Sequence, residues 1–148
     1  MRLLPALVLL GLPGLAAAQT VAACDDYRSN AQAIAEPWEA NTRLFSEGEV
    51  RLAVLDTIEP AAGAFHLLIL SPPYDEVGGR QCAVVSSGEG AGFAGLDLTE
   101  MTAGYDPVVG LTFAIPATRW VPDTDDFVPA VLSVTLHQAT GEIGAVLE

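Results

Sequence analysis

The chain has 148 residues and a formal net charge of −13 at pH 7, from 19 acidic residues against six arginines and no lysine. Nucleic acids and anionic membrane surfaces repel such a chain, so a partner that recognises charge is expected to be a cationic protein or peptide, or a metal ion. The same charge also serves simply to keep a protein in solution, and that alternative stays open. The length suffices for one domain with a hydrophobic core and is too short for two.

Residues 1–18 have the features of an export signal. A positive charge is followed by an apolar run, and Ala16–Ala18 before Gln19 fit the small-residue rule for cleavage by signal peptidase. The run contains two prolines and two glycines and is shorter than the about 20 residues that a membrane-spanning helix needs. We therefore predict a protein of the bacterial envelope, periplasmic or secreted, without a membrane span, whose mature part is a single domain of residues 19–148.

The two cysteines, Cys24 and Cys82, are expected to form a disulfide, because an exported chain reaches an oxidising compartment. In the chain-entropy model a bond that closes a loop of this length stabilises by roughly 4 kcal/mol. A competing interpretation is that the small residues before Cys24 are the recognition box of a bacterial lipoprotein, which would anchor the protein through a lipid on Cys24. The two interpretations exclude each other, because one thiol cannot form both bonds.

Residues 25–35 predict a short amphipathic helix at the start of the domain. Tyr27, Ala31 and Ile34 recur at helical spacing, and two aspartates stand near the N-terminal end, where the helix dipole favours negative charge. Pro37 would end this helix, because a proline inside a helix removes a hydrogen bond and clashes with the preceding turn.

The rest of the chain alternates apolar and polar residues between turn residues, which predicts seven to nine short strands. The expected strands lie at residues 41–45, 50–57, 64–70, 81–87, 101–105, 111–115, 130–138 and 143–147. Because the loops are short, neighbours along the chain should pair as an antiparallel meander. The predicted fold class is therefore α+β, with the short N-terminal helix packed on a strongly curved antiparallel sheet or a partial barrel.

The stretch of residues 64–70 is apolar on both alternating faces, which is typical of a strand covered on both sides. Pro72 and Pro73 should end it, because proline donates no ladder hydrogen bond, and Gly78 and Gly79 should let the chain turn back. His66 lies within this strand, where we expect it to be buried and hydrogen-bonded.

The loop after this strand is the candidate contact surface. Its prolines stiffen it, Tyr74 offers a rigid amphipathic ring, and Asp75 and Glu76 would attract a cationic partner. Arg80 at the end of the loop and Trp120, which stands between two later prolines, complete the candidate binding residues. A turn that merely connects two strands is the alternative.

Catalytic and metal-binding patterns are scarce. The sequence has no G-x-S-x-G or H-E-x-x-H motif, only two histidines, and no cysteine that stays free once a disulfide forms. The acidic loop of residues 123–126 lacks the glycine and the final carboxylate of an EF-hand, so we interpret it as a solvated turn. We assign no catalytic residue and expect neither a metal nor a cofactor.

The predicted function is a non-catalytic module that binds a protein or peptide, for example an inhibitor of a cationic secreted enzyme. Two alternatives of other classes stay open: a small hydrolase that uses His66, and a carrier of a small apolar ligand in a cavity of the curved sheet. A hydrolase needs a hydroxyl or carboxylate within about 3 Å of His66 in an open cleft. A carrier needs a large apolar cavity.

Overall fold

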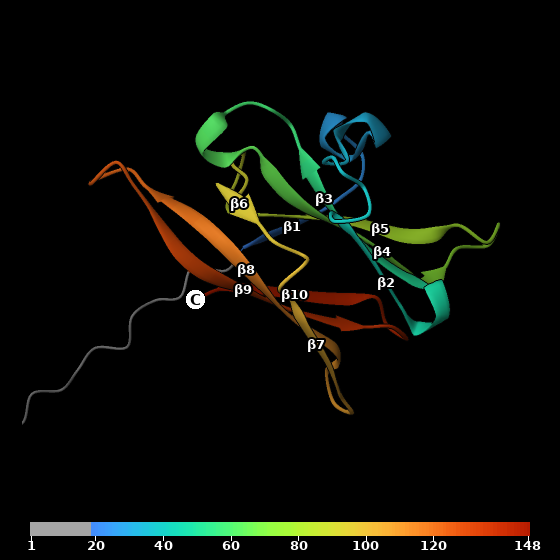
Figure 1. The fold of residues 1–148 in the computed structure, drawn as a ribbon. Coiled ribbons are helices and arrows are strands. Elements are labelled where there is room, and N and C mark those ends of the chain that lie inside the picture. The colour runs from blue at the N-terminus through green and yellow to red at the C-terminus, as the bar shows by residue number, and fades with distance from the viewer. Residues whose placement is uncertain (1–18) are drawn as a thin grey trace, which may run out of the picture.

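The computed structural model describes residues 19–148, and the predicted export signal lies outside these residues. The described chain forms two antiparallel five-stranded sheets that pack face to face (Figure 1). The first sheet has the order β1-β5-β4-β3-β2; the second has the order β10-β9-β8-β6, and β7 also pairs with β8. The strands are β1 (Thr20–Ala23), β2 (Thr42–Phe45), β3 (Val50–Asp56), β4 (Phe65–Tyr74), β5 (Arg80–Ser86), β6 (Gly95–Leu96), β7 (Thr102–Asp106), β8 (Gly110–Val121), β9 (Asp126–His137) and β10 (Glu142–Leu147).

The predicted N-terminal helix is absent from the described residues, and the α+β class is wrong. Two three-residue 3-10 turns, η1 (Tyr27–Ser29) and η2 (Ala31–Ala33), occupy the segment instead, and two more, η3 (Ser46–Gly48) and η4 (Ala61–Gly63), lie in later loops. Asn30 has extended backbone angles, with φ −65° and ψ 140°, which separates the first two turns. The next residues pair with β3, so sheet pairing overrides the weak helix propensity of a short segment.

The prediction of one curved sheet is also wrong, although antiparallel pairing between chain neighbours is confirmed. β2 to β5 pair in chain order, and so do β8 to β10. The unpredicted strand β1 pairs with β5 over four residues and occupies the edge that the next strand would need to extend the first sheet. The chain therefore crosses to a second sheet, and residues 19–148 contain ten strands instead of seven to nine.

Three strands run through prolines: β4, β8 and, at Pro129, β9. β4 continues through Pro72 and Pro73, with a register shift against β5 between Ser71 and Tyr74. β8 continues through Pro116 in unbroken register with β9. The Pro116 carbonyl accepts a hydrogen bond from Asp97 on the β6 side, so its nitrogen also faces that side and the missing N–H removes no bond to β9.

The main core lies between the two sheets. Alternate apolar residues of β3, β4 and β5 face those of β8 and β9, and the crossover after β5 adds Phe93 and Leu98. Burial of these side chains is the principal stabilising contribution. In β4, Leu67 and Ile69 belong to this core, whereas Leu68 belongs to a second cluster on the opposite face. The prediction that both faces of this strand are covered is therefore confirmed.

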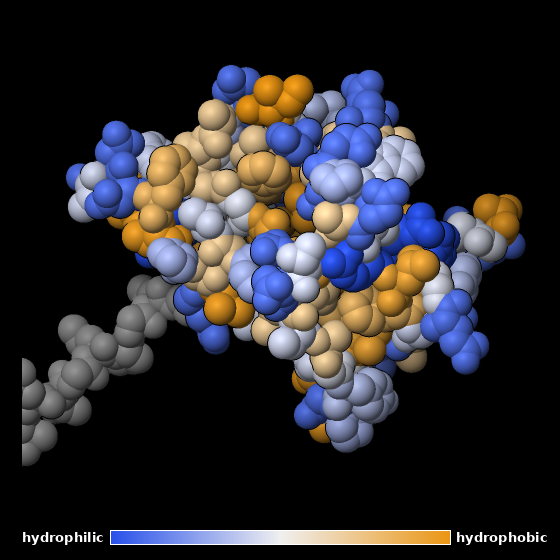
Figure 2. Space-filling model, in the orientation of Figure 1, coloured by the Kyte–Doolittle hydropathy of each residue, from blue (hydrophilic) through white to orange (hydrophobic). Residues whose placement is uncertain are grey.

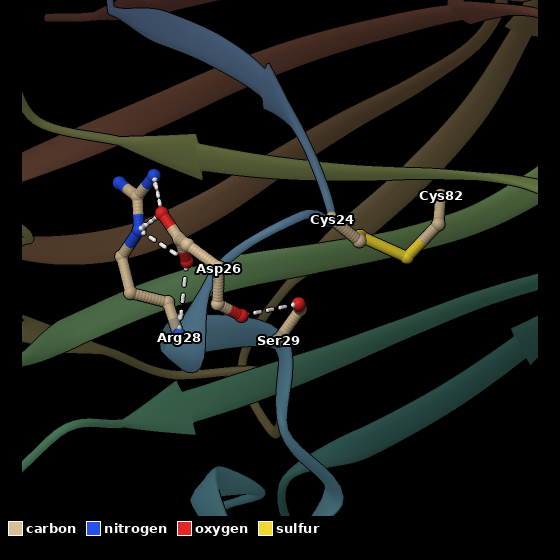
Figure 3. Close-up of a disulfide and its surroundings, with 5 residues drawn as sticks. All are labelled: Cys24, Asp26, Arg28, Ser29 and Cys82. Atoms are coloured by element: carbon tan, nitrogen blue, oxygen red, sulfur yellow. Dashed lines mark hydrogen bonds and ion pairs between the residues drawn. A yellow bond between two sulfur atoms is a disulfide. The ribbon is translucent and has the colours of Figure 1, made fainter.

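The second cluster lies on the outer face of the first sheet, under the segment that follows β1. A disulfide between Cys24 and Cys82 ties this segment to β5, as predicted (Figure 3). A thiol in a disulfide is not available for a lipid, so the structure favours the disulfide interpretation of Cys24. No helix within residues 19–148 is long and apolar enough to cross a membrane. Both findings are compatible with an exported protein.

Candidate functional site

The predicted contact loop is the β4–β5 hairpin turn, and its first carboxylate is used within the turn. Asp75 accepts hydrogen bonds from the N–H groups of Val77 at 3.0 Å and of Gly79 at 2.6 Å. The backbone N–H of Asp75 also donates to the Gly79 carbonyl at 2.8 Å. The Asp75 side chain therefore shapes the turn, and its charge is partly satisfied before any partner arrives.

The other end of this loop is tied to a neighbouring hairpin. The Arg80 guanidinium donates to the carbonyl oxygens of Gly48 at 3.2 Å and of Glu49 at 3.5 Å. Tyr74 and Glu76 remain exposed, and Tyr74 forms no side-chain hydrogen bond within the described residues. Of the four candidates on the loop, two are therefore free to meet a partner and two stabilise the loop itself.

The structure does not bring Trp120 near this loop. The β8–β9 hairpin, which carries Trp120, extends to one end of the molecule, and the β4–β5 hairpin extends to the opposite end (Figure 1). The predicted binding residues therefore form two separate surfaces.

Trp120 lines an apolar groove of about 290 Å³ at its end of the molecule. The groove lies between the β8–β9 hairpin and two loops of the first sheet, one before β4 and one after β5. In Figure 2 the surface between these elements, in the upper left of the view, is mostly tan to orange. The lining residues are Pro60, Ala62, Gly63, Ser87, Ala91, Gly92, Phe93, Ala94, Arg119, Trp120 and Pro122.

The floor of the groove depends on a close approach of two backbone segments. The Gly92 N–H donates to the Gly63 carbonyl at 2.8 Å, and Phe93 and Phe65 exchange two backbone hydrogen bonds of 2.7 and 3.0 Å. A Cβ atom on Gly92 would overlap the Phe65 carbonyl oxygen and lie 2.6 Å from that of Gly63. The two loops meet this closely because residue 92 has no side chain.

Trp120 forms one wall of the groove and is 38% exposed. Its indole N–H donates to the Asp125 carboxylate at 3.1 Å, which fixes the orientation of the ring. Phe127 is the cross-strand partner of Trp120 and is also exposed, so two large aromatic side chains lie on the same face of the hairpin. An oriented, partly exposed tryptophan is typical of residues that anchor a binding partner.

The charge at this end of the molecule is negative. Asp123, Asp125 and Asp126 lie in or beside the β8–β9 turn, and Arg119 lines the groove. Arg119 forms no ion pair within residues 19–148. Three carboxylates against one guanidinium leave an excess of negative charge, which favours a partner that carries positive charge next to its apolar contact.

A buried polar network lies behind the groove, on the outer face of the first sheet. Nδ1 of His66 lies 2.8 Å from Oγ of Ser86, which also accepts a hydrogen bond of 3.2 Å from Arg28. Arg28 is paired with Asp26 (Figure 3). Because a guanidinium only donates, the serine oxygen accepts from Arg28, and the same oxygen shares a second hydrogen bond with Nδ1 of His66.

This network meets one of the two requirements for a hydrolase. A hydroxyl lies within 3 Å of His66, and His66 borders a surface hollow of about 190 Å³, but His66 is only 3% and Ser86 only 1% exposed, so a substrate could reach little of the pair. Burial lowers the pKa of His66, the charge of Arg28 lowers it further, and Asp26 raises it. The predicted buried and hydrogen-bonded state of His66 is confirmed, and the arrangement favours a structural role over a catalytic one.

Sequence reasoning identifies Trp120 but misses the groove that it lines. The opposite wall consists of small residues, which carry no chemical group that a motif search would detect. A signal is nevertheless present, because residues 60–63 and 88–92 are two stretches rich in small residues on either side of the β4–β5 hairpin. Within residues 19–148, no three His, Cys, Asp or Glu side chains converge as metal binding would require.

Comparisons of the chain with models of protein families, with curated proteins and with solved structures found no match. Function must therefore be inferred from the geometry and chemistry of the site itself.

Proposed function

We propose that the protein is an exported, non-catalytic module that binds an apolar and basic segment of a partner protein in the groove beside Trp120. The observation that carries this proposal is the apolar groove, which places an oriented tryptophan next to a negatively charged turn. An inhibitor of a cationic secreted enzyme is one concrete form of such a module.

The size and lining of the groove set what it can hold. A volume of about 290 Å³ corresponds to that of roughly ten water molecules, taking about 30 Å³ for each. One large apolar side chain with part of its main chain fits this space. Burying such a side chain contributes about 1.5–3 kcal/mol, so the groove alone gives weak binding, which neighbouring contacts must strengthen.

Negative charge beside the groove is the second contribution to binding. The whole chain carries −13, and the turn beside the groove concentrates three carboxylates at the place where a partner would dock. Basic residues that flank the apolar anchor would therefore be steered to this end of the molecule, with an association rate that falls as salt is added.

A titration with a defined peptide tests the proposal. The probe is the acetylated and amidated peptide Lys-Val-Lys-Leu-Lys-Val-Lys, and its control has glutamate in place of each lysine. In amide NMR spectra of the mature domain, the basic peptide should shift the signals of Ala62, Phe93 and Ala94, and the acidic peptide should not. Trp120→Ala should weaken binding at least about fivefold, the loss typical of an aromatic anchor.

The chain offers a matched control in its other tryptophan. Trp38 is 51% exposed and lies beside a separate hollow on the outer face of the first sheet, so Trp38→Ala should leave binding unchanged. Equal binding by the wild type and Trp120→Ala would contradict the proposal. Shifts confined to residues 74–80 and abolished by Tyr74→Ala would instead place the contact on the loop predicted from the sequence.

A further inference from the structure

We infer that the partner segment docks as an added β-strand on the open edge of β8 at Trp120, in line with β6. This inference rests on the proposed function and specifies how the ligand is held. The occupant is an extended segment in which apolar residues alternate with lysine or arginine.

The edge of β8 on this side is only partly covered. β8 has twelve residues, of which residues 110–114 pair with β7 and residues 117 and 118 pair with β6. No strand of the described chain pairs with residues 119–121 on this edge. Figure 1 shows the β8–β9 hairpin reaching beyond β6.

The backbone of Trp120 points to this open edge. The carbonyl groups of Pro116 and Thr118 each accept a hydrogen bond of 2.9 Å from the segment that contains β6. Along a strand, the N–H and C=O groups of every second residue point to the same side, and the register of β8 with β9 is unbroken through Val121. The N–H and C=O groups of Trp120 therefore lie on the β6 side as well.

The chain before β6 does not cover these groups. Phe93 exchanges both of its backbone hydrogen bonds with Phe65 in the first sheet, so the chain leaves β8 before it reaches the level of Trp120. The same departure separates β8 from the first sheet and opens the apolar groove between them. The open edge and the groove are thus two results of one crossover, and a strand on the edge would lie along the groove.

This geometry determines the pattern of the segment that fits. Successive side chains of an added strand point to opposite faces, so every second residue would enter the apolar groove and the others would face solvent. The solvent-facing positions lie near the acidic turn of residues 123–126, which favours lysine or arginine there. The same turn disfavours pairing between two copies of this chain, because each copy brings the same negative charge to the edge.

The added ladder is short. Pro122 has no N–H, so Trp120 is the one residue of this open stretch that offers both a donor and an acceptor beside the groove. A net contribution of about 1 kcal/mol for each hydrogen bond implies weak and rapidly reversible binding, which suits measurement by NMR.

Amide hydrogen exchange with the same basic peptide tests the inference. In the free mature domain the Trp120 amide should exchange faster than the amides of Arg119 and Val121, which face β9. Saturating peptide should slow exchange at Trp120. Two further peptides carry N-methyl groups on alternate amides, one on the odd-numbered and one on the even-numbered residues. One of the two should bind at least about tenfold more weakly, because only one edge of the peptide pairs with β8.

Each result separates the strand pairing from the proposed function. If the unmodified peptide shifts the groove residues while Trp120 stays unprotected, the added strand is refuted and the groove remains the binding site. An equal loss of affinity for both N-methylated peptides, or a loss for neither, also refutes the added strand. Absence of groove shifts at millimolar unmodified peptide would overturn the proposed function and the strand pairing together.

Discussion

One methyl group added at Gly92 should destabilise the protein strongly, because the site has no room for a Cβ atom. In a Gly92→Ala variant this atom would overlap the Phe65 carbonyl oxygen and would lie 2.6 Å from the Gly63 carbonyl oxygen and 2.9 Å from Nε2 of His66. Two of these three neighbours are backbone atoms, which cannot move aside as the end of a flexible side chain does.

The magnitude follows from the hydrogen bonds that must give way. To relieve the overlap, residues 92 and 93 must move away from the start of β4, which breaks the bond from Gly92 to Gly63 and the two between Phe93 and Phe65. At about 1 kcal/mol net for each bond, the expected loss is about 3 kcal/mol, at the upper end of what overpacking usually costs.

Chemical denaturation measures this loss, and the same loop supplies the control. Gly88→Ala makes the identical substitution four residues earlier, where a Cβ atom would meet nothing within 4 Å. The midpoint of Gly88→Ala should match that of the wild type, and the midpoint of Gly92→Ala should fall. Equal midpoints for the two variants would show that the floor of the groove is not built as described.

Four more predictions concern the disulfide and the buried polar groups. Intact-mass measurement of the exported protein should give a chain that starts at Gln19 and lacks two hydrogens relative to the reduced chain, whereas a lipid adduct on Cys24 would support the lipoprotein interpretation. Ser86→Ala should lower the free energy of unfolding by about 1–3 kcal/mol, because it removes the hydroxyl that His66 and a guanidinium share. Ser71→Ala should leave it unchanged or raise it, since the buried Ser71 hydroxyl has no partner among the described residues; thermal unfolding of both variants decides. The free energy of unfolding should also fall below about pH 6.5, and less so in His66→Asn.

Most strands can be predicted from the sequence, because burial of one face imposes a period of two residues. Leu132, Val134 and Leu136 in β9 alternate with polar residues, and all three are buried. This period does not identify β1. It has four residues without an apolar alternation of its own, and its pairing with β5 depends on a partner far away in the chain and on the neighbouring disulfide.

The false helix and the missed groove have related causes. The spacing of Tyr27, Ala31 and Ile34 is a local signal, whereas the backbone bond from Ala35 to Val54 that replaces the helix is a long-range one. The groove is likewise a relation between distant segments, held together by glycine backbones that no residue pattern identifies as a site. Trp120, in contrast, could be singled out without any tertiary information, because an aromatic residue between two prolines is unusual.

The pH prediction rests on the direction in which folding moves the pKa of His66. Burial and then the charge of Arg28 lower this pKa in the folded chain. The unfolded chain, with an ordinary histidine pKa near 6.5, then binds more protons than the folded chain does. The stability that His66 contributes is therefore complete above about pH 6.5 and is lost as the pH falls through the folded-state pKa. The lowered pKa values of Asp26 and Asp97 act in the same direction but below 3.8, which is outside the interval from neutral pH to about pH 5.

His66→Asn removes the titrating ring but keeps a hydrogen-bonding group opposite Ser86, so the free energy of unfolding should lose its pH dependence in this interval. If the pH dependence of the free energy of unfolding persists in the variant, it belongs to another titrating group.

The ring of His66 also packs against Gly92, as the 2.9 Å approach of Nε2 to a Cβ at that position shows. Protonation should therefore disturb the floor of the groove as well as the sheet. We expect the Kd for the basic peptide to rise from pH 7 to pH 5 in the wild type and to rise less in His66→Asn, and an equal rise in both proteins would mean that the groove is independent of His66.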